Sequence, residues 1–215
     1  YKVKQKGATA KFKFGVQVPL GLKNAYQLDK INKNNYWQKA IDKELKQLND
    51  YNTFRVLKLW EKPPPEYQKI PYHIVFDVKF DLRRKARLVA GGNWTNPDKE
   101  DLYSGVVGME SVRLGFFLGE QNGLSCCAAD VGNAFLYGKT KEKVYIIAGS
   151  EFGPELQGRA LIIYKSLYGL RTSSARFHEH CAEKLRQLGF KPSLFDCDFW
   201  YRDVGDHYEY LATFV

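Results

Sequence analysis

The stretch Ala128-Ala129-Asp130-Val131-Gly132-Asn133-Ala134-Phe135-Leu136-Tyr137-Gly138 decides how this sequence is interpreted. It follows the apolar run 124–129, which predicts a buried strand that ends at Asp130. Mg²⁺ takes one or two protein carboxylates and completes its coordination with water and substrate phosphates. A carboxylate at the mouth of a buried strand is therefore a candidate magnesium ligand, and a solvated strand-end aspartate is the alternative.

Small residues and an aromatic follow this carboxylate. Gly132 and Ala134 would let a nucleotide approach the backbone, and Phe135 offers a flat apolar wall that would exclude a sugar 2′-hydroxyl. A second segment, Lys165-Ser166-Leu167-Tyr168-Gly169-Leu170-Arg171, comes after two apolar runs, 144–147 and 160–164, that predict a hairpin. Together the two segments look like parts of a polymerase.

Length and composition are those of a globular protein. The chain has 215 residues, of which 44% are hydrophobic, so it can bury a sizeable core. No apolar run approaches the roughly 20 residues that a membrane span needs, which predicts no membrane partner. The sequence begins at Tyr1 without a leader, so we expect a soluble piece of a larger protein. Its four cysteines lack metal-ligand spacing, which predicts reduced intracellular thiols and no zinc.

The positive charge lies in the first half of the chain. Residues 1–100 carry 21 Lys and Arg against 10 Asp and Glu, whereas residues 101–215 carry 12 against 14. Such asymmetry suits a surface that follows a nucleic-acid backbone, because lysines and arginines displace its condensed counterions. A solubilising face or a basic tail is the alternative.

Periodicity predicts the first elements. Residues 1–36 show no sustained helical pattern and indicate a connecting segment. From Trp37, apolar residues recur at helical spacing through Leu48, and Asn34 or Asn35 can cap this helix.

A basic hairpin is predicted next. Apolar and polar residues alternate over 74–80, which predicts a strand with one face exposed to solvent. Residues 86–90 form the second strand of the hairpin, and its tip, 81–85, is rich in Arg and Lys. The tip is either a solvated turn or a flap whose Lys79, Lys85 and Arg87 close over an anionic ligand.

Two further helices are expected. Ser111 can cap a helix that stops at Gly123, and Ser173 or Ser174 can cap one that ends at Gly189. On the second, His178 and His180 are two residues apart and should not share a metal, so we expect both on the surface.

These residues carry a resemblance to a known family. From about Tyr26 onward the sequence is similar to the reverse transcriptase of copia-type long-terminal-repeat retrotransposons. The variants at 103–107 and 169–174 resemble a branch known from diatoms and other microbial eukaryotes. The matching stretches, in order, are 37–44, 75–79, 84–92, 109–113, 128–138 and 165–171.

The resemblance implies a role for each candidate residue. Asp130 matches the first catalytic, metal-binding aspartate of the palm, with the Val131 carbonyl beside it. Phe135 matches the aromatic that screens the sugar 2′ position. Mg²⁺ is the implied cofactor, with Mn²⁺ as the alternative ion. The implied nucleotide-binding residues are Lys79, Lys85, Arg87, Gly132, Asn133, Ala134, Phe135, Tyr168 and Gly169.

The resemblance also implies an α+β fold, with the fingers and an incomplete palm of a right-hand polymerase, an antiparallel sheet and helices packed on one face. The implied parts are a connecting segment (1–36), fingers (37–107), palm (108–138), a fingers hairpin (139–170) and truncated palm (171–215). Partners would be an RNA or DNA template with primer, deoxynucleoside triphosphates and the remainder of a Pol polyprotein, including its RNase H domain. The location would be a cytoplasmic virus-like particle or the nucleus.

One expected element is absent from the sequence. In this family the strand that matches 208–215 leads into a pair of aspartates, which would lie beyond Val215. We therefore expect these 215 residues to be inactive alone, because two-metal phosphoryl transfer needs more carboxylates. The alternatives are a nucleic-acid-binding module without chemistry and an interaction protein derived from such an element.

Overall fold

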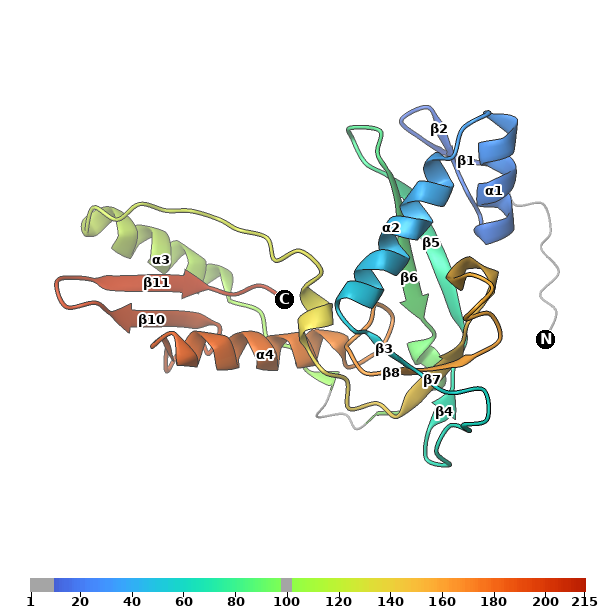
Figure 1. Cartoon of the computed structure of the whole chain (residues 1–215). Helices are drawn as coiled ribbons and strands as arrows, with labels where there is room; N and C mark the ends of the chain where they lie inside the picture. The colour runs from blue at the N-terminus through green and yellow to red at the C-terminus, as the bar shows by residue number, and fades with distance from the viewer. Residues whose placement is uncertain (1–9, 98–101) are drawn as a thin grey trace.

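The computed structural model describes residues 10–97 and 102–215, and Figure 1 shows two parts joined by long segments. In the described chain no helix is both long and apolar enough to cross a membrane. The helices are α1 (Leu22–Ile31), α2 (Tyr36–Asp50), α3 (Met109–Gln121) and α4 (Ser173–Gln187), with 3-10 turns η1 (Gly92–Trp94), η3 (Ala134–Tyr137) and η4 (Ser150–Phe152). The strands are β1 (Lys11–Lys13), β2 (Val16–Val18), β3 (Phe54–Val56), β4 (Gln68–Lys69), β5 (Tyr72–Val78), β6 (Arg84–Ala90), β7 (Val144–Ile147), β8 (Ala160–Ile163), β9 (Lys191–Pro192), β10 (Phe199–Asp203) and β11 (Tyr208–Ala212).

Helix α2 and the β5–β6 hairpin form the body of the first part. The predicted helix and both predicted strands are confirmed. Trp37 and Ile41 are buried against one face of the hairpin, where the Trp37 ring meets Phe76 edge to face with centroids 5.5 Å apart. An aromatic pair of this geometry contributes about 0.5–1.5 kcal/mol beyond its buried area.

The sequence predicted that residues 1–36 are a connecting segment, and for residues 10–36 this prediction is wrong because they are packed. These residues form the β1–β2 hairpin and α1, and Val18, Ala25 and Leu28 are buried in one cluster with α2 and β5. Residues 1–9 lie outside the described chain. Helix α1 has only ten residues, which is too short for its periodicity to be recognised in the sequence. A helix of this length is stabilised mainly by packing against the rest of the protein.

The predicted cap of α2 is only partly right. Asn34 accepts a hydrogen bond from the Tyr36 N–H at 3.3 Å, whereas Asn35 makes no side-chain capping bond. The next two N–H groups, of Trp37 (3.1 Å) and Gln38 (2.9 Å), donate to the buried Asp29 at the end of α1. Most of the cap therefore comes from a neighbouring helix and ties α1 to α2.

A four-stranded sheet in the order β3-β8-β7-β4 completes the first part. The predicted β7–β8 hairpin is confirmed, and β3 pairs antiparallel with β8. Strand β4 pairs in parallel with β7, so this sheet is mixed rather than wholly antiparallel. Its core includes Ile146, Leu161 and Leu167, which are buried together with Leu88 of β6.

The second part consists of α3, α4 and the sheet β11-β10-β9. Both predicted helices are confirmed, and Gly123 and Gly189 take the positive φ that a helix end favours. The serine caps are wrong. Ser111 lies inside α3 and donates to Asp196, while the Ser173 hydroxyl donates to the Leu167 carbonyl.

The expected buried strand at 124–129 is wrong. Residues 124–132 have no regular secondary structure, and Figure 1 shows them as a long segment between α3 and η3. Leu124 is half-buried and residues 125–132 are exposed. A strand needs a hydrogen-bonded neighbour, and no strand of the described chain pairs with this segment. Apolar composition alone is therefore not enough to make it a strand.

Candidate nucleotide site

Three separate segments meet at Arg87, Tyr168 and Phe135. The Arg87 guanidinium, on β6, lies 3.7 Å from the centroid of the Tyr168 ring. The same ring contacts Phe135 of η3, with centroids 4.9 Å apart. All three side chains are half-buried. The structure thus brings together a cation and two aromatics from distant parts of the sequence.

Glycines allow the segment that carries Tyr168 to lie against β6. Gly169 has φ +92°, and a Cβ atom there would lie 2.1 Å from the carbonyl oxygen of Ala90. A Cβ on Gly92 would lie 2.1 Å from the carbonyl oxygen of Gly169. The Ala90 N–H donates to the Tyr168 carbonyl at 2.7 Å. The end of the 84–92 stretch and the 165–171 stretch are therefore in direct backbone contact.

Positive charge continues from Arg87 along the hairpin. Burial lowers the pKa of the Lys85 ammonium, and the nearby charges of Arg87 and Lys79 lower it further. The three predicted fingers cations are thus close enough to repel one another. An anion that binds between them would relieve this repulsion, which is the electrostatic condition of a phosphate site.

Glu44 of α2 lies beside this cationic surface, and the sequence reasoning missed it. Its carboxylate accepts a hydrogen bond from the Leu88 N–H at 3.0 Å, on the outer edge of β6. Burial raises the pKa of Glu44, while this hydrogen bond and the charges of Arg87 and Lys85 act in the opposite direction. Glu44 therefore connects α2 to β6 and places a carboxylate near the charges of Arg87 and Lys85. Its position on the helix gives no signal of this contact in the sequence.

Asp77 is a second residue that the sequence reasoning did not assign. Its carboxylate binds the Lys13 ammonium at 2.6 Å and lies 3.8 Å from that of Lys79. The hydrogen bond from Lys13 lowers the pKa of Asp77. The β1–β2 hairpin is thereby attached to β5, next to the predicted flap.

The predicted metal ligands lie on the exposed segment before η3. Asp130 and Val131 are exposed, and the Asp130 carboxylate has no hydrogen-bond or ion-pair partner within residues 10–97 and 102–215. Gly132 is also exposed, and Asn133 takes a left-handed conformation (φ +55°) that turns the chain into η3. Ala134 is the first residue of η3 and precedes Phe135. Asp130 is thus close in sequence to the aromatic contact, and its catalytic role stays a prediction.

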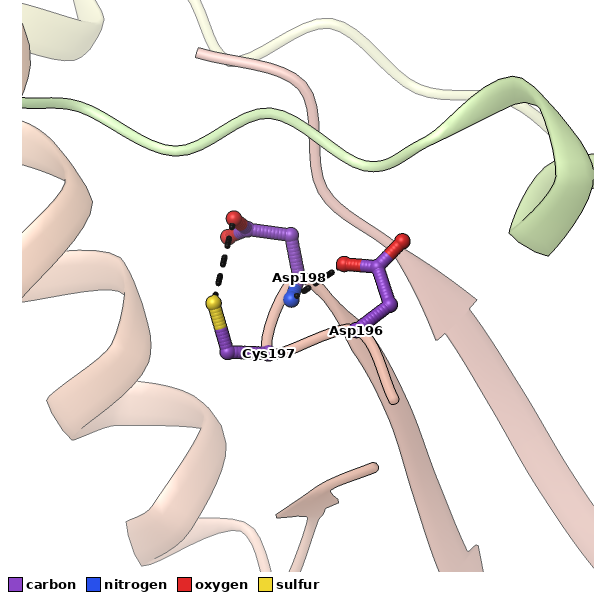
Figure 2. Close-up of side chains that lie close together, drawn as sticks. All are labelled: Asp196, Cys197 and Asp198. Carbon is purple, nitrogen blue, oxygen red and sulfur yellow. Dashed lines mark hydrogen bonds between the residues drawn. The ribbon is translucent and has the colours of Figure 1, made fainter. Parts of the chain in front are cut away.

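One acidic cluster elsewhere has the spacing of a metal site. In the described chain, Asp196, Cys197 and Asp198 place one ligand atom each within 4.8 Å of the others. Figure 2 shows the Asp196 carboxylate accepting from the Asp198 N–H, and the Cys197 thiol directed at the Asp198 carboxylate.

Hydrogen bonds give this cluster a structural explanation. Asp196 accepts from the Gly108 N–H at 2.9 Å, at the start of α3, and from the Ser111 hydroxyl. The buried Asp198 accepts from the Thr213 hydroxyl at 3.0 Å and pairs with the ring of His178 at 2.5 Å. The expectation that His178 is a surface residue is therefore wrong, since it is half-buried and joins α4 to the start of β10. His180 stacks on Tyr137.

A comparison with known families identifies the family of most of the chain. The family model described as "Reverse transcriptase (RNA-dependent DNA polymerase)" matches residues 51–215. The match covers more than half of the chain and includes β6, η3 and the segment that carries Tyr168. It does not include α1, α2 or the β1–β2 hairpin.

Proposed function

The chain belongs to the family of reverse transcriptases (RNA-dependent DNA polymerases), and on this premise we propose that Arg87, Tyr168 and Phe135 bind an incoming deoxynucleoside triphosphate. The contact between these three side chains is the observation that carries the proposal. A guanidinium stacked on a ring keeps its N–H groups available for phosphate oxygens. Lys85 and Lys79 extend the positive charge along the triphosphate, and Phe135 screens the sugar 2′ position.

The proposed metal ligands are the Asp130 carboxylate and the Val131 carbonyl. Oxygen ligands suit Mg²⁺ or Mn²⁺, and no partner among the described residues competes for the carboxylate, so the two residues fit one ion. Mg²⁺, when bound, would neutralise charge on the transferred phosphoryl group. A two-ion reaction needs further carboxylates, and those of Asp196 and Asp198 are already engaged by α3 and α4. We therefore propose that these 215 residues do not extend a primer alone.

The proposal extends to the source and the partners of the domain. We assign it to a copia-type retrotransposon of the diatom-like branch, with an RNA or DNA template, a primer and the rest of a Pol polyprotein as partners. It would act inside the cell, in a virus-like particle or the nucleus. The resemblance of the 103–107 and 169–174 variants to that branch supports the source.

Nucleotide binding tests the site. We expect the purified chain to bind a fluorescent dATP analogue with Mg²⁺, measured by anisotropy. Arg87→Gln removes a charge-assisted hydrogen bond of about 1.5–3 kcal/mol, which is at least a tenfold loss of affinity. Arg55→Gln is the control, because it removes the same charge from β3, where Arg55 is exposed, is paired with Glu61 and is not among the residues proposed to bind the nucleotide. Equal losses for both variants would contradict the proposed site.

Two further assays test the chemistry. Phe135→Ala should raise affinity for a ribonucleotide analogue relative to the deoxynucleotide, because the wall against the 2′-hydroxyl is removed. Primer extension by the 215-residue chain should be undetectable. Extension that Asp130→Asn abolishes would show that the ligands in this chain are sufficient, and it would refute the proposed inactivity.

A further inference from the structure

The tips of two hairpins meet in an exposed aromatic patch. The Phe14 ring, in the β1–β2 turn, contacts the Phe80 ring beyond β5 edge to face, with centroids 5.8 Å apart. Phe14 is 50% exposed and Phe80 is 89% exposed. Phe12 and Leu82, near the same tips, are also exposed. We call Phe12, Phe14, Phe80 and Leu82 the hairpin-tip patch, and Figure 1 shows the turns of the two hairpins near each other.

Backbone strain at both tips sets this patch apart from ordinary turns. Phe14 has φ +50° and precedes Gly15 at φ +76°, so the two turn residues adopt positive φ as in a type I′ turn. Asn, Asp and Gly favour that position, whereas a bulky side chain there is an outlier. Leu82, in the other turn, has φ +63°. Strained residues of this kind concentrate at functional sites, and here both strained side chains are apolar and exposed to water.

Positive charge surrounds these rings. The Lys13 ammonium lies 5.6 Å from the centroid of Phe14 and pairs with Asp77, which also lies near Lys79. Asp77 therefore holds one lysine from each hairpin beside the aromatic pair. Lys11 has no partner in the described chain.

A basic groove continues from the patch. It has a volume of about 220 Å³ and lies between α2 and the β5–β6 hairpin. Most of its lining residues carry positive charge, and Lys79 is the residue next to Phe80. The cations are Lys43, Lys79, Arg83, Arg84 and Lys85.

We infer that the hairpin-tip patch binds single-stranded nucleic acid. Bases would stack on Phe14 and Phe80, and the backbone phosphates would contact Lys13 and the groove cations Lys43, Arg83 and Arg84, which are not assigned to the triphosphate. Exposed aromatics beside cations are the usual platform for single strands, because every base has a face that stacks. The inference rests on the proposed function in one respect only, which is that the bound single-stranded nucleic acid is identified as the unpaired template. Phe12 and Phe14 lie outside the residues that the family model matches.

Binding of oligonucleotides without metal or nucleotide tests this inference. We compare fluorescein-labelled single-stranded DNA and RNA of about 20 nucleotides with a blunt duplex of the same length, by anisotropy at one salt concentration. The variant Phe14→Asn with Phe80→Ala should weaken single-strand binding at least tenfold, because both stacking rings are lost, and change duplex binding less than about twofold. Tyr103→Ala, which removes an exposed aromatic elsewhere, should leave both affinities unchanged. Asn suits the turn, so Phe14→Asn alone should not lower the melting temperature.

Two outcomes would overturn the inference. One is equal single-strand affinity for the wild type and the double variant. The other is concentration-dependent self-association of the wild type that the double variant loses, since the patch would then be a protein interface. Either result leaves the nucleotide site untouched, because Arg87→Gln is measured with a different ligand. Conversely, loss of nucleotide binding does not alter the single-strand measurement.

Discussion

Replacing Gly169 by alanine tests how the Tyr168 segment is held against β6. The new Cβ would lie 2.1 Å from the Ala90 carbonyl oxygen and 3.0 Å from the Ala90 nitrogen. Both are backbone atoms of a buried strand residue, so no side chain can rotate to make room. The two segments must separate by about 1 Å to restore ordinary contact.

The cost has two parts. An alanine at φ +92° costs about 1–2 kcal/mol relative to an unstrained conformation. Separation also breaks the 2.7 Å hydrogen bond from the Ala90 N–H to the Tyr168 carbonyl, and leaving these groups unpaired costs about 1–3 kcal/mol. We expect a total loss of about 2–5 kcal/mol, which is a large share of the roughly 5–15 kcal/mol that stabilises a typical protein.

Comparing the urea unfolding of Gly169→Ala and Gly158→Ala measures the cost of separating the two segments, apart from the cost of the positive φ. Gly158 has φ +81°, and a Cβ atom there would meet nothing within 4 Å, so alanine bears only the conformational cost. We expect the first variant to lose about 1–3 kcal/mol more than the second. Binding of the dATP analogue should fall only in Gly169→Ala, because Tyr168 moves away from Arg87. Equal losses of stability for the two variants would refute the close backbone contact.

Two other residues give sharp predictions. Asp29→Ala removes the acceptor of the Trp37 and Gln38 N–H groups, and we expect a loss of about 1–2 kcal/mol, read as a melting temperature lower by roughly 2–8 °C. Asp29→Asn keeps one acceptor oxygen and should lose less, so equal losses would exclude capping as the cause. Glu44→Gln removes a carboxyl group whose pKa is raised in the folded state, while Gln can still accept from Leu88. Wild-type stability should therefore fall as pH rises through the folded pKa of Glu44, and the variant should be more stable than the wild type at about pH 7.5 but equal to it near pH 4, as measured by urea unfolding.

The sequence predicted the elements whose burial follows a regular period. Helix α2 buries Trp37, Ile41 and Leu48 on one face, and β5 alternates between buried Phe76 and Val78 and their more exposed neighbours. These patterns arise because one face of each element packs on a core, so the period is visible without the fold. The prediction for Phe80 was wrong, because the strand ends at Val78 and Phe80 extends into water.

Contacts between elements were not predictable in this way. Asp29 caps the helix that follows its own, and Glu44 reaches the edge of a strand 44 positions along the chain. A polar residue on a helix is expected to be solvated unless its neighbour is known. The unpaired segment 124–132 is the opposite case. Its apolar residues fit a strand, but a strand forms only where another strand supplies hydrogen bonds.

The nucleotide surface and the candidate metal ligands are therefore stabilised by different means. Arg87 and Tyr168 are held by β6, by Glu44 and by a backbone contact that two glycines permit. Asp130 lies on an exposed segment without strand partners, and its carboxylate has no hydrogen-bond or ion-pair partner among the described residues. The proposed phosphate contacts therefore do not depend on the segment that carries Asp130. We expect nucleotide affinity to persist in Asp130→Asn while its dependence on Mg²⁺ is reduced, as measured by anisotropy of the dATP analogue with and without the ion.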